Sequence, residues 1–479
     1  MTRLLQKQAF IGASWLGVFK LFSQIISWIV TILIARILLP DDYGLSAMAT
    51  IITSYAEIFS ELGLGASIIQ KSGQTKKELS SVFWFAFFVS IFFALLCFPF
   101  SYITAEIFNE DRIIPLTQAV SILFIFSGLQ IVPLNILKKE MNFKMVGMIE
   151  LKSTIISCLG MLIIAYMGGG VWALIGGRII RGFVRLLLVY NAAKWYPLMH
   201  MDFREAKQYI KFGITVAVGT SLFYIFENSD KYFAGRVWPI KDLGYYLFAM
   251  QLAQIPTEKI VVLINQVSYS VFSKLQHDKE QFNKFYLNLI KIAATIVLPM
   301  FICGYLIGEE IVKVVLGEKW MPSAYLFKNL CLVQIATSLN AINNFVHMSQ
   351  GYPKRGMFYN ALLAVFMSIS FYLVVDHGMN AILYPWFTTY IIMSVIWIYY
   401  TINKLGINVY KYIKNITIPI AGILLMLVTH EFICAVILPG DINENYFLLL
   451  KIFSLTIVYL CFVYIFDNEL IKGIKKLRK

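Results

Sequence analysis

Two stretches of this sequence carry the same pattern: residues 34–44 read IARILLPDDYG and residues 234–244 read AGRVWPIKDLG. Each lies between a long apolar run that ends and another that begins. Three residue types recur at an offset of 200 positions, and they pair as Arg36 with Arg236, Asp42 with Asp242 and Gly44 with Gly244. Because unrelated loops seldom share an arginine, an aspartate and a glycine in one register, we interpret the stretches as two hinges of an internal duplication.

The composition is that of an integral membrane protein. Of the 479 residues, 59% are hydrophobic and 14% charged, and the mean hydropathy is +0.72. A soluble protein of this size cannot bury so much apolar surface. The apolar runs do not alternate as barrel strands do, and the first, residues 10–35, is too long for a signal peptide. We therefore expect an all-α polytopic membrane protein.

The apolar runs predict 14 transmembrane helices. Their expected limits are 10–35, 44–69, 80–105, 113–137, 149–168, 170–190, 210–234, 243–272, 286–308, 324–348, 355–375, 379–402, 413–437 and 446–467. With the N-terminus in the cytoplasm, the cytoplasmic segments hold about 25 Lys and Arg residues and the opposite side about six. This asymmetry predicts an even number of spans and cytoplasmic N- and C-termini, and it accounts for the net charge of +14 without a nucleic-acid partner.

The duplication continues beyond the hinges. Pro99 matches Pro299 at the offset of 200, and three later matches have an offset of 209: Gly147 with Gly356, Gly169 with Gly378, and Tyr190 with Tyr399. A parallel repeat predicts two pseudo-symmetric six-helix lobes facing a central cavity, plus two C-terminal helices. The expected division is an N-lobe at 1–190, an interfacial cytoplasmic linker at 191–209, a C-lobe at 210–402, and the last two helices with a basic cytoplasmic tail at 403–479.

The sixth predicted span carries a stripe of three arginines: Arg178, Arg181 and Arg185. They fall within about 60° of one another on a helix. A charge at the membrane centre costs roughly 2.5–3.5 kcal/mol, so each should face a partner or a wet cavity. Snorkelling to the interface is adequate for Arg185 alone. Because guanidinium forms paired hydrogen bonds to phosphate, we expect the stripe to bind an anion, to which Lys152 and Lys20 could add positive charge.

Several acidic residues inside predicted spans are candidates for taking up protons or another coupling cation; otherwise they neutralise nearby cations. They are Glu57 and Glu61 in the second span, Glu227 and Asp230 in the seventh, and Glu258 in the eighth. Counting from the first hinge places Lys20 and Glu57 at similar depth, which predicts an ion pair that is either structural or part of the transport path. His347 and His430 lie near span ends, where a lone histidine is more typical of the interface than of a proton relay.

No pattern indicates an enzyme or a cofactor. The six cysteines lie inside spans without CxxC spacing, so we expect neither disulfides nor a metal site. Residues 168–170 are a glycine triplet in a tight turn, without the ending of a phosphate loop, so no nucleotide is expected. The sequence contains no nucleophile elbow, no HExxH motif and no large outer loop holding acids.

The first hinge resembles polysaccharide-transport proteins of the Wzx type, in the multidrug/oligosaccharidyl-lipid/polysaccharide exporter superfamily. The pattern is A-R-x-L-x-P-x-x-Y-G at residues 35–44, followed by ELGL at residues 61–64; the stretch MDFREAKQYIKFG at 201–213 is also similar. The resemblance covers essentially the full chain. It implies a flippase that moves a polyprenyl-diphosphate-linked oligosaccharide across the bacterial inner membrane, alongside a polysaccharide polymerase and glycosyltransferases.

Two functions of other classes stay open. A cation-coupled multidrug exporter of the same superfamily would present more aromatic and acidic cavity faces. A membrane glycan polymerase or ligase would need a sizeable outer loop with catalytic acids or histidines, and the longest expected outer loops, near 309–323 and 438–445, are short. We expect alternating access between the two lobes, in which the arginine stripe captures the diphosphate.

Overall fold

The computed structural model describes residues 2–61, 64–71, 73–257, 268, 271–272, 275–276, 278–436 and 443–467. Within these residues the chain is helical and contains no strand, as expected. Nine of the described helices are long and apolar enough to cross a membrane. The protein is therefore a multi-pass membrane protein, whereas the count of 14 spans and the arrangement of two six-helix lobes stay predictions.

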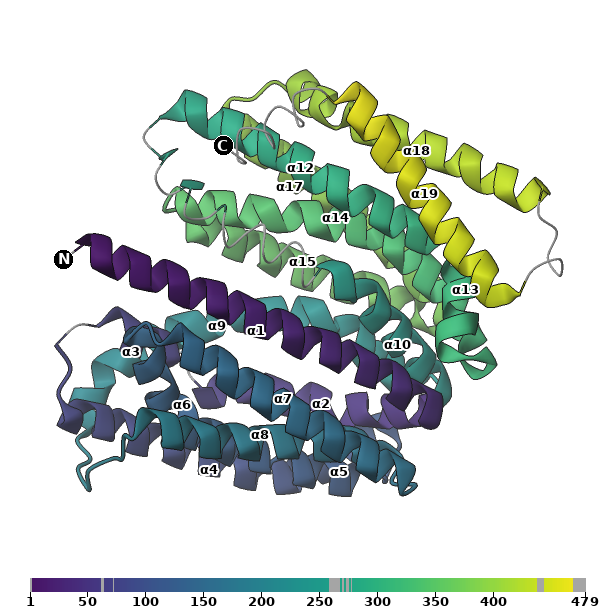
Figure 1. The fold of residues 1–479 in the computed structure, drawn as a ribbon. Coiled ribbons are helices and arrows are strands. Elements are labelled where there is room, and N and C mark those ends of the chain that lie inside the picture. Colours follow the sequence, from purple (N-terminus) through teal and green to yellow (C-terminus); the bar gives the residue numbers. More distant parts are fainter. Residues whose placement is uncertain are drawn as a thin grey trace. The chain divides into compact units, whose positions relative to one another are not determined.

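The chain divides into two compact units, residues 1–244 and 245–479 (Figure 1). The helices of the first unit are α1 (Thr2–Ile37), α2 (Pro40–Glu61), α3 (Leu64–Gln70), α4 (Lys76–Phe108), α5 (Ile113–Val120), α6 (Ile122–Lys139), α7 (Phe143–Tyr166), α8 (Val171–Ala193) and α9 (Phe203–Val237). Helix α10 (Ile240–Pro256) begins in the first unit and continues into the second.

The second unit continues with long helices joined by short ones. Its α-helices are α12 (Lys279–Leu306), α13 (Gly308–Ile311), α14 (Ala324–Ser349), α15 (Pro353–Val374), α16 (Leu383–Pro385), α17 (Ile391–Leu405), α18 (Val409–Val436) and α19 (Glu444–Phe466). The connecting π and 3₁₀ turns are η2 (Val312–Leu316), η3 (Glu318–Ser323), η4 (Val375–His377), η5 (Met379–Ile382) and η6 (Trp386–Tyr390).

The two hinges interrupt their helices at matching positions. The helix before the hinge ends at Ile37 in the first copy and at Val237 in the second, and the helix after it begins at Pro40 or Ile240. The amides of Leu38 and Trp238 each donate to the carbonyl four residues earlier, both at 2.8 Å. The stretches 42–50 and 242–250 also have the same order of buried and half-buried side chains. The duplication expected at the hinges is therefore present in the backbone.

The hinges differ in how the second helix is capped. In the first copy the amide of Leu39 donates to the carboxylate of Asp42 at 2.8 Å, which satisfies a backbone donor at the start of α2. The second copy has Pro239 at the position of Leu39. Because proline has no N–H, Asp242 cannot accept the same bond there.

Gly44 and Gly244 lie against the opposite hinge. A Cβ on Gly44 would be 2.4 Å from the carbonyl oxygen of Ile240, and a Cβ on Gly244 would be 1.9 Å from that of Pro40. Both distances are too short for any side chain, so glycine is required at both positions for close backbone approach. The reciprocity is what a local two-fold relation between the hinges produces.

The segment before α9 is extended and is hydrogen-bonded to the first turns of α4. Leu198 donates its amide to Ser80 Oγ at 2.9 Å and accepts from Trp84 Nε1 at 2.8 Å. Asp202 donates its amide to Ser81 Oγ at 3.0 Å. Its carboxylate accepts from the amide of Arg204 at 2.8 Å and so begins α9. These bonds fix the connection that leads into α9.

Helix α9 packs against α2 and α4. It therefore belongs to the first compact unit, which ends at Gly244 and not at the expected N-lobe limit of residue 190. A compact unit and a sequence repeat are different divisions of the chain. The lobe limits given above remain predictions.

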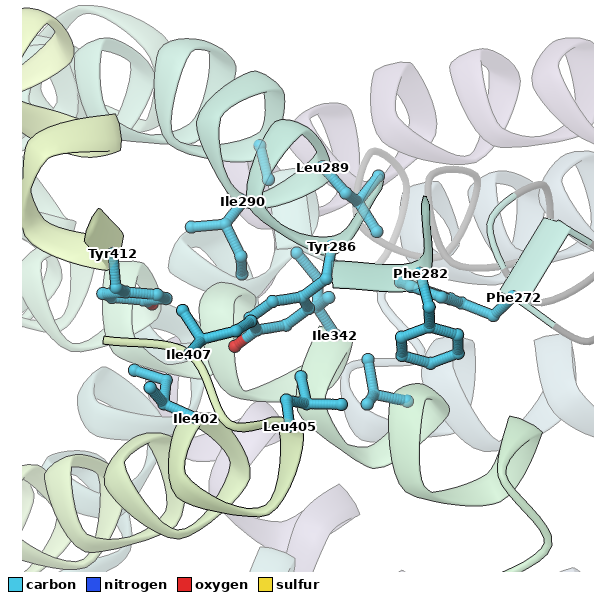
Figure 2. Close-up of a cluster of buried hydrophobic side chains, with 12 residues drawn as sticks. Phe272, Phe282, Tyr286, Leu289, Ile290, Ile342, Ile402, Leu405, Ile407 and Tyr412 are labelled. Atoms are coloured by element: carbon cyan, nitrogen blue, oxygen red, sulfur yellow. The ribbon is translucent and has the colours of Figure 1, made fainter. Parts of the chain in front are cut away.

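In the second unit, a buried cluster joins α12 and α14 to the end of α17 and the start of α18. Figure 2 shows Tyr286 near the centre of this cluster, with Tyr412 and Phe282 to either side. The hydroxyl of Tyr286 donates to Asn343 Oδ1 at 2.8 Å, so the buried ring also satisfies its polar end. Helix α19 is held by two ion pairs: Lys291–Asp467 at 2.7 Å and Lys451–Glu310 at 2.6 Å.

Candidate functional site

The arginine stripe of α8 meets carboxylates from two other helices of the first unit, although Arg178 and Arg181 are themselves exposed. Arg178 lines a small pocket of about 20 Å³, room for about one water molecule. The pocket is also lined by Thr53, Ser54, Glu57, Val120, Leu123 and Phe124. Helices α2 and α8 thus place one guanidinium and one carboxylate in a common polar pocket.

Glu57 is the charged partner on α2. It accepts a hydrogen bond from Ser127 Oγ of α6 at 3.2 Å. It also interacts electrostatically with Arg178 and Arg185. The positive charge of Arg178 in this pocket is therefore partly neutralised by the Glu57 carboxylate.

Tyr224 of α9 completes this part of the site. Its hydroxyl donates to the carbonyl oxygen of Ile51 at 2.6 Å, and its ring centroid lies 5.6 Å from that of Tyr55. Tyr224 also interacts electrostatically with Arg178 and Glu57. Residues from α2, α8 and α9 therefore meet here, none of which is among the nine helices that qualify as simple apolar spans in the described part of the chain.

The other two arginines of the stripe share one carboxylate. Arg181 Nη2 forms a close ion pair with Glu150 Oε1 of α7, and Arg185 Nε lies 3.8 Å from Glu150 Oε2. The three side chains are 48%, 33% and 25% exposed for Arg181, Arg185 and Glu150. This second part of the site is therefore partly exposed at the surface of the unit.

The sequence analysis missed Glu150, although a signal was available. Helices α7 and α8 are joined by a short turn at residues 167–170. Two helices so joined run antiparallel, and a similar residue count back from the turn and forward from it leads to Glu150 and Arg185. Counting from this turn would have placed the carboxylate beside the stripe.

The expected ion pair between Lys20 and Glu57 is wrong. Lys20 is exposed and forms no ion pair with a described residue, and the charged neighbours of Glu57 are arginines of α8. Counting residues from a hinge estimates the depth of a side chain, but it does not give the direction of that side chain around the α1 axis. Lys152 is likewise exposed, without an ion pair to any described residue.

Of the other candidate acids, Glu227 shares a neighbour with Glu57, because both interact electrostatically with Tyr224. Asp230 is buried, with 1% of its surface exposed, whereas Glu227 three residues earlier is exposed. Lys231 donates to Asn228 Oδ1 at 2.8 Å. Two further candidates, Glu258 and the side chain of Glu61, lie outside the described part of the structure.

The second unit has neutral contacts where the first has charges. Thr257, at the repeat position of Glu57, bonds to Gln334 at 2.9 Å and lies 3.2 Å from Ser338 Oγ, both of α14. In each half, then, a residue in the fifth turn of the helix that follows the hinge contacts the fourth predicted span of its repeat. The contact between these helices is thus present in both repeats, but it involves a carboxylate in the first and only neutral groups in the second.

The interfacial interpretation of His347 is wrong. The side chain is buried, with 1% exposed, and its Nε2 lies 3.0 Å from Thr401 Oγ1. Its ring packs 4.7 Å from that of Trp397. Position along a span gave no information about this packing between α14 and α17. His430 is half-buried.

One arginine–carboxylate pair lies outside the site, in the loop between α4 and α5. Arg112 donates from Nε and Nη2 to the two carboxylate oxygens of Glu110, at 2.7 and 2.9 Å. The adjacent guanidinium holds the pKa of Glu110 below its ordinary value. This ion pair joins the same two residue types as the Glu150–Arg181 pair, but it lies outside the candidate site.

Residues 33–325 match the sequence profile of a family described as polysaccharide biosynthesis protein. The match covers more than half of the chain. The chain belongs to the polysaccharide biosynthesis protein family. The matched stretch includes the first hinge, the arginine stripe and the second hinge, so these three features lie in the part that the family model covers.

Two named relatives have low sequence identity to this chain, but the similarity covers a large part of each protein. The teichuronic acid biosynthesis protein TuaB of Bacillus subtilis (strain 168) is 23% identical over 84% of this chain and 85% of its own length. The lipopolysaccharide biosynthesis protein WzxC of Escherichia coli (strain K12) is 24% identical over 70% of this chain and 68% of its own. This member of the polysaccharide biosynthesis protein family is thus similar to proteins of cell-surface glycan synthesis.

Solved structures agree on the fold. The lipid II flippase MurJ, in an inward closed conformation, is similar with a TM-score of 0.77 at 15% identity, covering 95% of this chain and 99% of that one. An inward-facing multidrug resistance MATE family transporter has a TM-score of 0.56 at 13% identity, over 83% and 98% of the chains. The polysaccharide biosynthesis protein family member described here therefore has a membrane-transporter fold.

Proposed function

We propose that this protein is a flippase for a polyprenyl-diphosphate-linked oligosaccharide, the repeat unit of a cell-surface polysaccharide. It works in the inner membrane of a bacterium with both termini in the cytoplasm, 14 spans and two six-helix lobes. The observation that carries the proposal is the α8 stripe, in which Arg178, Arg181 and Arg185 lie beside Glu57 and Glu150 of the first unit.

The arginines are proposed to hold the diphosphate. Guanidinium groups bind phosphate oxygens through paired, charge-assisted hydrogen bonds, which persist in a site partly removed from water. Arg181 and Arg185 are solvent-accessible, so a headgroup can reach them. Lys152 is exposed on α7, two residues after Glu150, and is proposed to add positive charge to the region.

Transport is proposed to follow alternating access. The polar glycan enters a wet cavity while the lipid tail stays in the bilayer, and the lobes then rock about the two glycine hinges. No nucleotide takes part in this scheme. The energy comes from an ion gradient, with Glu57, Glu61, Glu227, Asp230 and Glu258 as candidate coupling acids, or from removal of the product by a polysaccharide polymerase. Glycosyltransferases supply the substrate.

The test is flipping in proteoliposomes. Purified protein is reconstituted with a labelled undecaprenyl-diphosphate oligosaccharide, and exposure of the label in each leaflet is followed with and without a proton or sodium gradient. We expect the Arg178→Ala/Arg181→Ala variant to lose flipping and Arg112→Ala, outside the site, to retain it. Thermal unfolding of each variant separates loss of function from loss of structure.

Two results would overturn the proposal. Full flipping by the double variant would remove the stripe from the mechanism. Absence of flipping for several glycans, together with efflux of small organic cations, would favour the multidrug exporter.

A further inference from the structure

One carboxylate cannot satisfy both arginines that surround it. Glu150 forms a close ion pair with Arg181, but its second oxygen is 3.8 Å from Arg185 Nε, beyond hydrogen-bond distance. Arg185 Nε is buried and has no acceptor among the described residues. A buried charged donor without an acceptor is costly. This pair of arginines is therefore under-occupied by the residue that holds it.

Arg181 and Arg185 are four residues apart on α8, so their guanidinium groups are neighbours on one face. Two acceptor groups on one ligand can serve both, one phosphoryl group for each arginine. A diphosphate provides two such groups and two negative charges. A single phosphodiester provides one group and one charge, which is what Glu150 already supplies.

We propose that Glu150 is a specificity-determining residue, which admits diphosphates to the arginine pair and excludes monoanionic phosphodiesters such as phospholipid headgroups. The inference rests on the proposed function, since it concerns the same anion site. A diphosphate replaces one charge by two and satisfies Arg185 Nε. A phosphodiester would replace the single charge of Glu150 by its own single charge. It would also separate Glu150 from Arg181 and Arg185. Selectivity therefore comes from competition between Glu150 and the ligand for the arginines, as well as from the attraction of the arginines for phosphate.

The need for such selectivity follows from the position of the site. A flippase that takes a lipid from the membrane meets phospholipids in large excess over its substrate. A cluster of arginines without a carboxylate partner binds any phosphate group. The Glu150 carboxylate prevents binding of phospholipid headgroups, because only a ligand with more negative charge than Glu150 gains free energy by displacing this carboxylate.

Binding to soluble diesters tests the proposal on purified full-length protein. Uridine diphosphate glucose is a diphosphate diester, and glycerophosphoglycerol is a phosphodiester with one charge; neither changes its charge near neutral pH. Wild-type protein is expected to bind the first and to bind the second far more weakly. In Glu150→Gln the preference should fall by about tenfold, the change expected for one charge–charge contact.

The same variants are then placed in nanodiscs with and without phosphatidylglycerol. This anionic lipid should weaken binding of uridine diphosphate glucose to Glu150→Gln and leave the wild type unaffected. Glu150→Asp retains the charge and should restore the selectivity. Glu110→Gln is the matched control, because it removes a carboxylate from an arginine pair outside the site.

The outcomes separate this inference from the proposed function. If wild type and Glu150→Gln both fail to bind the diphosphate diester, the anion site itself is wrong. If both bind it with equal preference over the phosphodiester, the anion site stands and Glu150 has only a structural role. Thermal unfolding confirms that each variant is folded before binding is compared.

Discussion

The carbonyl oxygen of Pro40 lies 1.9 Å from the position that a Cβ atom on Gly244 would occupy. The reverse contact joins Gly44 to the carbonyl of Ile240, at 2.4 Å. Both obstructions are backbone atoms, so no change of rotamer relieves them. Two positions 200 residues apart thus require glycine for the same steric reason.

Alanine at these hinges should destabilise the protein and impair flipping. Overpacking typically costs about 1–3 kcal/mol, and Gly244→Ala should be worse than Gly44→Ala because its contact is shorter. Gly17→Ala is the control, since a Cβ there meets no atom within 4 Å. Thermal unfolding and the proteoliposome assay measure the two effects. Equal stability of all three variants would contradict the reciprocal packing.

The Glu57–Arg178 relationship should appear as coupling in a double-mutant cycle. Arg178→Gln removes one of the two arginines that interact with Glu57, and a loss of about 1–3 kcal/mol in unfolding free energy is expected. Adding Glu57→Gln should recover part of that stability but not flipping, because the anion site still lacks its arginine. Additive effects on stability would mean that the two side chains act independently.

Helix α19 should depend on the buried pair of Lys291 and Asp467, whose side chains are 10% and 1% exposed. Breaking a buried pair from one side costs about 3–5 kcal/mol, so Asp467→Asn should lower the unfolding temperature strongly. Glu444→Gln breaks the exposed pair with Lys313 and should have no measurable effect. Similar unfolding temperatures for the two variants would show that burial of the pair does not matter.

The extended segment before α9 should loosen when Ser81 is replaced. Its hydroxyl donates to Glu205 at 2.7 Å and accepts from the amide of Asp202 at 3.0 Å. Ser81→Ala should cost about 1–2 kcal/mol and speed both proteolysis and amide exchange at residues 194–202. Ser454→Ala, whose hydroxyl bonds only to its own helix, is the control. Unchanged exchange would mean that other contacts hold the segment.

The hinges and the helical class could be predicted from the sequence because both depend on local information. Hydropathy marks apolar helices, and a repeated Arg, Asp and Gly marks a duplicated turn. The glycine positions were identified in this way, and the structure supplies their steric reason. What the repeat could not reveal is that the two hinges contact each other.

The partner of Glu57 could not be predicted, for a physical reason. Counting from a hinge gives the depth of a side chain but not its direction around the helix. Helix α1 packs against α7, where Gly147 faces Leu16 and Phe19. That packing sets the rotation of α1, and Lys20 is left exposed. The rotation depends on contacts between distant segments, which one sequence does not reveal.

The limit between the two compact units falls inside α10, between Gly244 and Tyr245. The covalent link across it is therefore a turn of α-helix rather than a flexible tether. A tether allows the parts it joins to reorient independently, whereas a continuous helix passes on twist and tilt. A change in the tilt of α10 at Gly244 is accordingly transmitted along the helix to Pro256. Gly244 and Pro256 thus lie on one continuous helix.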